Sequence, residues 1–318
     1  GELLHIMWTP LLLCLLAVAA TTAENLPWKP NTQYQYELTG RTLAALHQVT
    51  AQYTGLRMKA TVTVEKRSED TISAQVHNAQ YSNVHANLSQ GWSTPIPEGQ
   101  LHYQQIPLSN KPFQLKYKNG AIVSMVVSKE IPNWELNILK SIASQLQVDT
   151  QAENLQKSRI NSLPTKNTAN GVYKTMEDSV SGECETLYDI SPLPRVVLQN
   201  KPQLAPMPQL QADGQLIDIV KTRNFSNCDI PSAYHFGITG LTDWEPASNQ
   251  MGRFLARSSV SRIIIAGNLQ RYTIQSSVTT NKIIASPFLY EKQNGMVVSR
   301  MNLTLVDVKS ASSSPQSP

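Results

Sequence analysis

A repeated alternation of apolar and polar residues limits what this chain can fold into more than any other feature. In the clearest run, every second residue from Leu56 to Val64 is apolar, and the residues between them are polar or charged. Successive side chains of a β-strand point to opposite faces, so such a run places its apolar side chains on one face of a sheet. The pattern predicts strands at 33–38, 56–65, 72–77, 113–118, 121–127, 257–266, 270–284 and 296–308.

Asn-Gly and Asp-Gly pairs predict turns between the strands. Asn119-Gly120 separates two alternating runs, and both residues of such a two-residue turn take positive φ, which Asn and Gly tolerate. Three further pairs are Asn170-Gly171, Asp213-Gly214 and Asn294-Gly295. Together these signals predict a large, many-stranded antiparallel β domain.

One segment, 132–147, has a helical pattern instead. Pro132 suits a first helical turn, and the apolar residues from Trp134 to Leu146 cover roughly half of the helix circumference at about 100° per residue. So wide an apolar arc indicates burial on several sides, which a helix enclosed by a many-stranded sheet would explain. The alternative is a helix that lies on one face of the sheet.

The N-terminal segment predicts secretion. The apolar run from Met7 to Ala20 is shorter than the about 20 residues that span a bilayer, and small residues follow it. We therefore expect residues 1–23 to be a secretory signal, with 1–6 upstream of a start at Met7. Charged residues make up only 16% of the chain, which also suits an extracellular β protein better than a charged helical bundle.

Secretion makes the cysteines and the glycosylation motifs informative. Removal of Cys14 with the signal leaves Cys184 and Cys228, an even pair that predicts one disulfide; two buried free thiols are the alternative. Asn-x-Ser/Thr motifs predict glycans at Asn87, Asn224 and Asn302. The Ser-rich residues 309–318 predict the start of a flexible linker, and hence that the chain is a fragment of a longer protein.

Signatures of catalysis are missing from the sequence. It contains no nucleophile elbow, no Gly-rich phosphate loop, no metalloprotease helix motif and no Cys pair at zinc spacing. We therefore expect neither an enzyme nor a metal site, and no cofactor in this fragment.

Basic residues gather in two parts of the chain. In 246–300 seven Lys and Arg face one acidic residue, Glu291, and a second group lies at 111–118, with Arg57 and Lys59 expected nearby. Residues that share a sheet face raise the local positive potential, which favours docking of an acidic partner; a solvated sheet face is the alternative. Aromatic residues are too sparse among them for a nucleic-acid platform. The candidate docking residues are Lys111, Lys116, Lys118, Arg253, Arg257, Arg262, Arg271 and Lys282.

Several longer segments resemble the N-terminal part of insect vitellogenins, the secreted yolk precursors of the large lipid transfer protein group. They are NWELNILKSI at 133–142, SQLQVDTQ at 144–151, MEDSV at 176–180, GEC at 182–184, NFSNCD at 224–229, QSSVTT at 275–280 and SRMNLTL at 299–305. The resemblance covers nearly all of 24–308.

The resemblance implies a fold and a function. Residues 24–308 should form a β-barrel wrapped around the helix at 132–147, with Cys184 and Cys228 at the disulfide positions of the family. The Ser-rich end matches the start of the linker to a helical domain, and lipid is expected in the full-length protein, held mostly by later domains. The expected partner is an oocyte receptor of the low-density lipoprotein receptor type, whose acidic modules would recognise a basic surface. The full-length protein is expected to be secreted and to form homo-oligomers.

Two other functions remain open on the sequence. One is a related lipid transfer protein, such as an apolipophorin or a microsomal triglyceride transfer subunit, against which the Ser-rich end argues. The other is a free-standing secreted binding module. The Arg-x-x-Arg site at which the family is processed near its linker is absent from 301–318.

Overall fold

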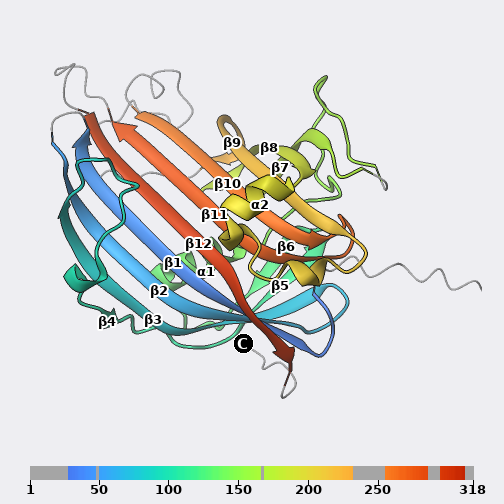
Figure 1. Ribbon diagram of the computed structural model, residues 1–318, viewed down its shortest axis with the longest axis horizontal. Helices are drawn as coiled ribbons and strands as arrows, with labels where there is room; N and C mark the ends of the chain where they lie inside the picture. Colours follow the sequence, from blue (N-terminus) through green and yellow to red (C-terminus); the bar gives the residue numbers. More distant parts are fainter. Residues whose placement is uncertain (1–27, 48–49, 166–167, 232–254, 286–293, 312–318) are drawn as a thin grey trace, which may run out of the picture.

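The computed structural model describes residues 28–47, 50–165, 168–231, 255–285 and 294–311, in which twelve strands form one antiparallel sheet (Figure 1). The predicted signal, 1–23, lies outside these residues. The strands are β1 (Thr32–His47), β2 (Gln52–Lys66), β3 (Thr71–Asn87), β4 (Gln104–Gln105), β5 (Phe113–Lys118), β6 (Ala121–Val126), β7 (Gly171–Ser179), β8 (Gly182–Pro192), β9 (Gln215–Pro231), β10 (Leu255–Gly267), β11 (Tyr272–Ala285) and β12 (Asn294–Ser310). The helices are α1 (Asn133–Gln145) and α2 (Arg195–Asn200), with short 3-10 helices η1 (Glu98–Gln100), η2 (Pro202–Leu204) and η3 (Pro208–Gln211).

The sheet curls into a nearly closed barrel. Its strand order is β6-β5-β3-β2-β1-β12-β11-β10-β9-β8-β7, with β4 paired to β3 outside this path. The two ends of the domain meet where β1 pairs with β12, with Tyr36 opposite Leu305. The predicted class, a mainly β chain with a many-stranded antiparallel barrel, is confirmed.

A single glutamine connects the two edge strands of the barrel, β6 and β7. The Oε1 of Gln147 accepts a hydrogen bond from the backbone N–H of Ile122 on β6 at 2.9 Å. Its Nε2 donates to the backbone carbonyl of Asp178 on β7, also at 2.9 Å. Gln147 is buried, so these two bonds satisfy groups that the missing strand pairing leaves open.

The alternation in the sequence decides what the barrel encloses. Tyr34, Tyr36 and Leu38 of β1 are buried, as are Val62 and Val64 of β2, and all belong to one large apolar cluster. The polar residues between them face outward. At a buried Leu or Val, this burial contributes about 1.5–3 kcal/mol, so the alternating runs supply much of the stability of the domain.

Helix α1 is enclosed at its C-terminal end and open at its start. Leu139, Ile142 and Leu146 are buried, and every residue from 145 to 150 is buried. The tyrosine hydroxyls of three strands reach this segment: Tyr117 donates to the carbonyl of Leu146, Tyr272 to that of Val148 and Tyr173 to that of Asp149. The predicted enclosed helix is thus present, but Trp134 in its first turn is 45% exposed, so the predicted apolar arc is too wide.

The predicted turns have mixed outcomes. Asn119-Gly120, with φ of 51° and 93°, closes the hairpin of β5 and β6 as expected. Asn170-Gly171 and Asp213-Gly214 do not close hairpins, because each lies where a strand begins after an irregular segment. The residues before Asn294-Gly295 lie outside the described part of the chain.

In the described residues, no helix has the length and apolar character needed to cross a membrane.

Candidate functional site

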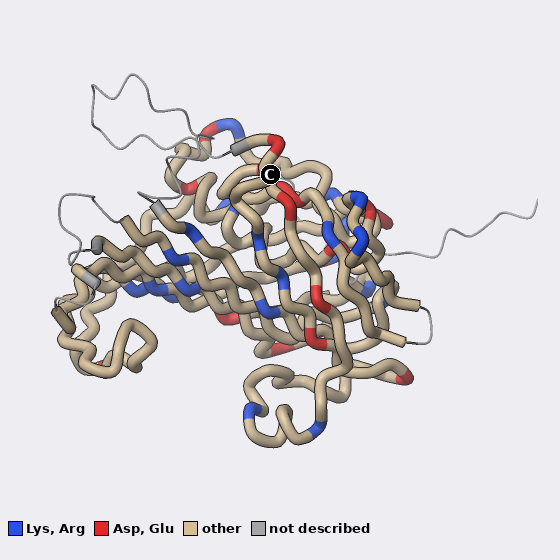
Figure 2. Tube along the Cα trace, turned by 90° about the horizontal axis from the view of Figure 1, so that it is seen from above, with Lys and Arg blue, Asp and Glu red and all other residues tan. Residues whose placement is uncertain are grey.

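Three arginines lie side by side on the outer face of the barrel wall. Arg41 of β1 is opposite Arg57 of β2 on one side and opposite Arg300 of β12 on the other. We call these three residues the arginine row. Residues directly opposite each other on antiparallel strands have Cβ atoms about 4.5–5.5 Å apart, so the row concentrates three positive charges. Figure 2 shows Lys and Arg positions side by side on neighbouring strands of the barrel.

The arginine row has few acidic partners. Among the described residues, Glu98 of η1 is the carboxylate that pairs with it, with Arg57 Nη2 and Glu98 Oε1 2.9 Å apart. Arg41 donates to the carbonyl of Thr94 and Arg300 to the hydroxyl of Thr280. Burial lowers the pKa of Arg41, and the neighbouring charges of Arg300 and Arg57 lower it further. The row therefore carries an excess of positive charge.

An indole extends over part of the arginine row. The guanidinium carbons of Arg300 and Arg41 lie 4.6 and 5.6 Å from the ring centre of Trp92. Beside Arg57 on the same strand face, Lys59 Nζ lies 3.8 Å from the ring centre of Tyr103. Such cation–π contacts hold the charges in place without neutralising them.

The docking residues predicted from the sequence do not belong to the arginine row. Four of them form ion pairs: Lys111 with Glu130, Lys116 with Asp70, Lys118 with Glu153 and Arg262 with Asp218. Arg257 stacks on Phe225, with 3.9 Å between its Cζ and the ring centre. Arg271 is exposed and Lys282 is half-buried on β11. Arg253 lies outside the described residues.

The sequence prediction named neither Arg41 nor Trp92. Arg57 and Lys59 were expected near the second basic group, and Arg300 counted among the basic residues of 246–300. What joins them is the pairing of β1 with β2 and β12, which no local pattern in the sequence specifies.

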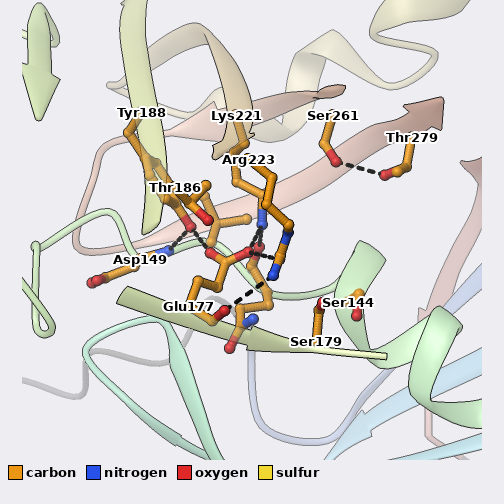
Figure 3. Close-up of polar contacts among 12 residues, drawn as sticks. Ser144, Asp149, Glu177, Ser179, Thr186, Tyr188, Lys221, Arg223, Ser261 and Thr279 are labelled. Atoms are coloured by element: carbon orange, nitrogen blue, oxygen red, sulfur yellow. Dashed lines mark hydrogen bonds and ion pairs between the residues drawn. The ribbon is translucent and has the colours of Figure 1, made fainter. Parts of the chain in front are cut away.

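On the inner face, Glu177 of β7 is the centre of a buried group of polar side chains (Figure 3). Its Oε1 lies 2.7 Å from Lys221 Nζ and 3.3 Å from Arg223 Nη2. Tyr188 of β8 donates its hydroxyl hydrogen bond to Oε2 of the same carboxylate. We call Glu177, Tyr188, Lys221 and Arg223 the Glu177 cluster.

Burial governs the protonation of this cluster. It lowers the pKa of Lys221, while the carboxylate of Glu177 opposes that effect. It raises the pKa of the Tyr188 phenol well above its usual range, and the charge of Glu177 raises it further. Near the cluster, burial raises the pKa of Asp149 to about 6, although the backbone N–H groups of Glu153 and Asn154 hydrogen-bond to its carboxylate.

A polar cavity of about 80 Å³ adjoins the Glu177 cluster. We call it the serine cavity, because hydroxyls from α1 and from five strands or their ends surround it. Its charged wall residues are Glu177, Lys221 and Arg223. The hydroxyl and amide residues on its wall are Ser141, Ser144, Gln145, Ser179, Ser181, Thr186, Ser259, Ser261, Thr279, Asn281 and Ser299.

The predicted modification sites differ in their surroundings. Cys184 of β8 and Cys228 of β9 form a disulfide. Asn87 is exposed at the end of β3, and Asn224 is exposed but donates to Glu185 at 3.0 Å. Asn302 lies in the middle of β12 and donates to Thr39, and its buried Oδ1 has no partner among the described residues. The three glycans remain predictions.

Within the described ranges, no three His, Cys, Asp or Glu side chains come together in a way that could hold a metal ion.

Comparison with known proteins places these sites in a family context. A family model described as the vitellogenin N-terminal domain matches residues 28–313. A vitellogenin of Anthonomus grandis is 38% identical over 98% of this chain and 17% of its own length. A vitellogenin of Aedes aegypti is 40% identical over 94% of this chain and 14% of its own length. The chain therefore spans less than a fifth of these relatives.

A solved structure is also similar. It is a lipovitellin chain, described by its lipid–protein interactions, with a TM-score of 0.64 and 16% sequence identity. The match covers 91% of this chain and 26% of the lipovitellin chain. At this level of identity, the likeness shows a common fold.

Proposed function

The chain belongs to the vitellogenin N-terminal domain family, and from that premise we propose that it is the N-terminal barrel of a secreted yolk precursor. The full protein would carry lipid and store nutrients for the oocyte, with lipid held mainly by domains beyond this chain. It would circulate in hemolymph, form homo-oligomers and enter the oocyte by a receptor. The barrel would serve that uptake as a binding module and not as an enzyme.

We propose that the arginine row is the part of the barrel that docks the receptor. A receptor of the low-density lipoprotein receptor type presents acidic modules, and the row offers three adjacent guanidiniums with Glu98 as their acidic neighbour. Guanidinium groups bind carboxylates with two parallel hydrogen bonds, which adds geometric selection to charge attraction. This excess charge is the observation that supports the proposal.

The lysines at 111–118 are weaker candidates for the same role. Each of them has a carboxylate partner of its own within the barrel. An acidic receptor module would have to replace an existing ion pair at each lysine, so the net gain in binding free energy would be small.

Matched triple variants test the docking proposal. One variant carries Arg41→Gln, Arg57→Gln and Arg300→Gln, and its control carries Lys111→Gln, Lys116→Gln and Lys118→Gln, which removes the same charge. We expect the arginine variant to bind the receptor ectodomain at least about tenfold more weakly, because one charge-assisted hydrogen bond contributes about 1.5–3 kcal/mol. Its affinity should also depend less on salt.

The lysine variant should bind within about twofold of the unmodified chain, since it removes pairs that are already satisfied. Unfolding midpoints confirm that both variants are folded. A larger loss with the lysine variant would move the docking site to 111–118, and equal affinity of all three chains would exclude both surfaces.

The carrier role is tested independently of the docking surface. An antibody raised against this chain should detect, in female hemolymph and in ovary, a protein far larger than 35.3 kDa that floats with lipid in a density gradient. A single lipid-free band near that mass in both sexes would instead indicate a free-standing binding module.

A further inference from the structure

We propose that the serine cavity binds a small inorganic anion, of the size of phosphate, sulfate or chloride, through Arg223 and Lys221. The site lies on the inner face of the barrel and is separate from the arginine row on the outer face. Its ligand would be an ion held inside the barrel, whatever partner docks outside.

The first step of the argument is the charge around the cavity. Lys221 and Arg223 face it with two positive charges, and Glu177 is its one acidic wall residue. Their side chains are only 5%, 8% and 4% exposed. A buried charge without a counter-charge is costly, so an excess of one cation beside a polar cavity that is only partly open to solvent favours an anion there.

Asp149 is a second acidic residue whose charge acts on Lys221. It does not line the cavity, and its carboxylate oxygens accept hydrogen bonds from the backbone N–H groups of Glu153 and Asn154. Its charge acts on Lys221 only over a distance. The excess of positive charge at the cavity wall therefore remains.

The second step is the number of hydrogen-bond donors left over. Arg223 uses both Nη1 protons, for the carbonyls of Glu177 and Gly182, and one Nη2 proton, for the carboxylate of Glu177. An arginine has five N–H donors, so Nε and the second Nη2 proton have no acceptor among the described residues. Lys221 likewise uses two of its three protons, for Gln147 and Glu177.

The third step is the shape and chemistry of the cavity. In Figure 3, Ser144 and Ser179 lie on the side of Arg223 that faces away from Tyr188. Ser259 and Ser299 also line the wall, and among the described residues neither hydroxyl has a hydrogen-bond partner. Serine hydroxyls rotate to donate wherever an acceptor lies. The cavity volume of about 80 Å³ is several times the roughly 10–15 Å³ that one water needs, so the cavity has room for a few waters or one small anion.

Calorimetric titration of the folded chain with sodium phosphate, sulfate and chloride, in a buffer free of all three, tests the proposal. We expect saturable binding of at least one of these ions at a single site. Arg223→Gln removes the excess charge and should weaken binding about tenfold or more, the effect of losing one charge-assisted hydrogen bond. Arg262→Gln, which removes the same charge from an outer ion pair, is the control and should bind as the unmodified chain does.

A second variant keeps the test decisive if Arg223→Gln does not fold. Ser299→Leu fills the cavity from β12 and leaves every residue of the Glu177 cluster in place. We expect it to abolish binding while the chain remains folded. Absence of saturable binding to the unmodified chain, or equal binding by the unmodified chain and by Ser299→Leu, would overturn the proposal and leave water as the occupant of the cavity.

Discussion

The arginine row and the Glu177 cluster both gather positive charge, one on the outer face of β1, β2 and β12 and the other on the inner face of β7, β8 and β9. Outside, three guanidiniums lie next to one another with one acidic neighbour, because water and the ring of Trp92 moderate their repulsion. Inside, two cations are held by a carboxylate, a phenol and backbone carbonyls, because burial allows little unpaired charge. The comparison teaches that solvent access, more than charge, decides how completely a cation must be paired.

The largest expected effect comes from removing the acidic residue of each site. Glu177→Gln leaves Lys221 and Arg223 buried without a counter-charge, and should lower the free energy of unfolding by about 3–5 kcal/mol. Glu98→Gln removes the acid beside the arginine row, and should lower it by less than about 1 kcal/mol, because that pair is exposed. Urea denaturation of both variants measures the contrast. Equal losses would show that burial does not distinguish the two sites.

The next largest effect is the pH dependence of the unfolding free energy that arises from Asp149, near the Glu177 cluster. The pKa of Asp149 is raised from 3.8 to about 6, so its native carboxyl keeps a proton at pH values where the unfolded one has lost it. Stability from this group is therefore present below pH 4 and is lost as pH rises through 6, a change of about 3 kcal/mol.

The measurement is the unfolding free energy of the unmodified chain and of Asp149→Asn between pH 4 and 7. The unmodified chain should lose stability relative to the variant over that range. The titration of the other acidic groups is common to both chains, so it cancels in the difference between their unfolding free energies. A difference that does not change with pH would mean that Asp149 titrates normally.

A smaller effect concerns the glutamine that joins the edge strands. Gln147→Leu keeps the volume but leaves the N–H of Ile122 and the carbonyl of Asp178 without their partners, and should cost about 2 kcal/mol. Gln105→Leu, at an exposed position on β4, should change stability by less than about 0.5 kcal/mol. In Gln147→Leu, amide hydrogen exchange should increase first along β6 and β7. Unchanged exchange at both strands would show that other contacts close the barrel.

The smallest effect on stability is expected at the arginine row, on the outer face of the barrel. Arg41→Gln relieves repulsion from Arg57 and Arg300, and should leave the unfolding free energy within about 0.5 kcal/mol, with any change toward greater stability at low salt. Salt titration of the melting temperature checks this, since added salt should stabilise the unmodified chain more than the variant. A large loss of stability would mean that Arg41 is a structural residue.

Much of the barrel was predictable from the sequence, because alternation reports directly on which face of a strand is buried. It identified β1, β2, β3, β5 and β6 and the strands from β10 to β12, but not the two-residue β4, and the helical period identified the helix before Gln147. It did not identify β7, β8 and β9, whose inner positions include Thr175, Glu177, Lys221 and Arg223. Where polar residues face both inward and outward, a strand shows no apolar–polar alternation in its sequence.

The sites were less predictable than the fold, because each is assembled by strand register. Glu177 meets Lys221 and Arg223 only through the pairing of β7 with β8 and of β8 with β9, which includes bulges on both sides of Cys184. Composition along the chain identified basic residues but not their partners. The sequence analysis therefore selected Lys116 and Lys118 as docking candidates and did not select Arg41, although the structure pairs both lysines with acids.

The pairing of β1 with β12 also has a consequence for biosynthesis. β1 is made among the first residues of the domain and finds its second neighbour only when the last strand leaves the ribosome. At about 5–20 residues per second, its open edge waits on the order of tens of seconds. During that time a sixteen-residue strand can pair with a neighbouring nascent chain, so folding of the domain should depend on a chaperone that covers this edge.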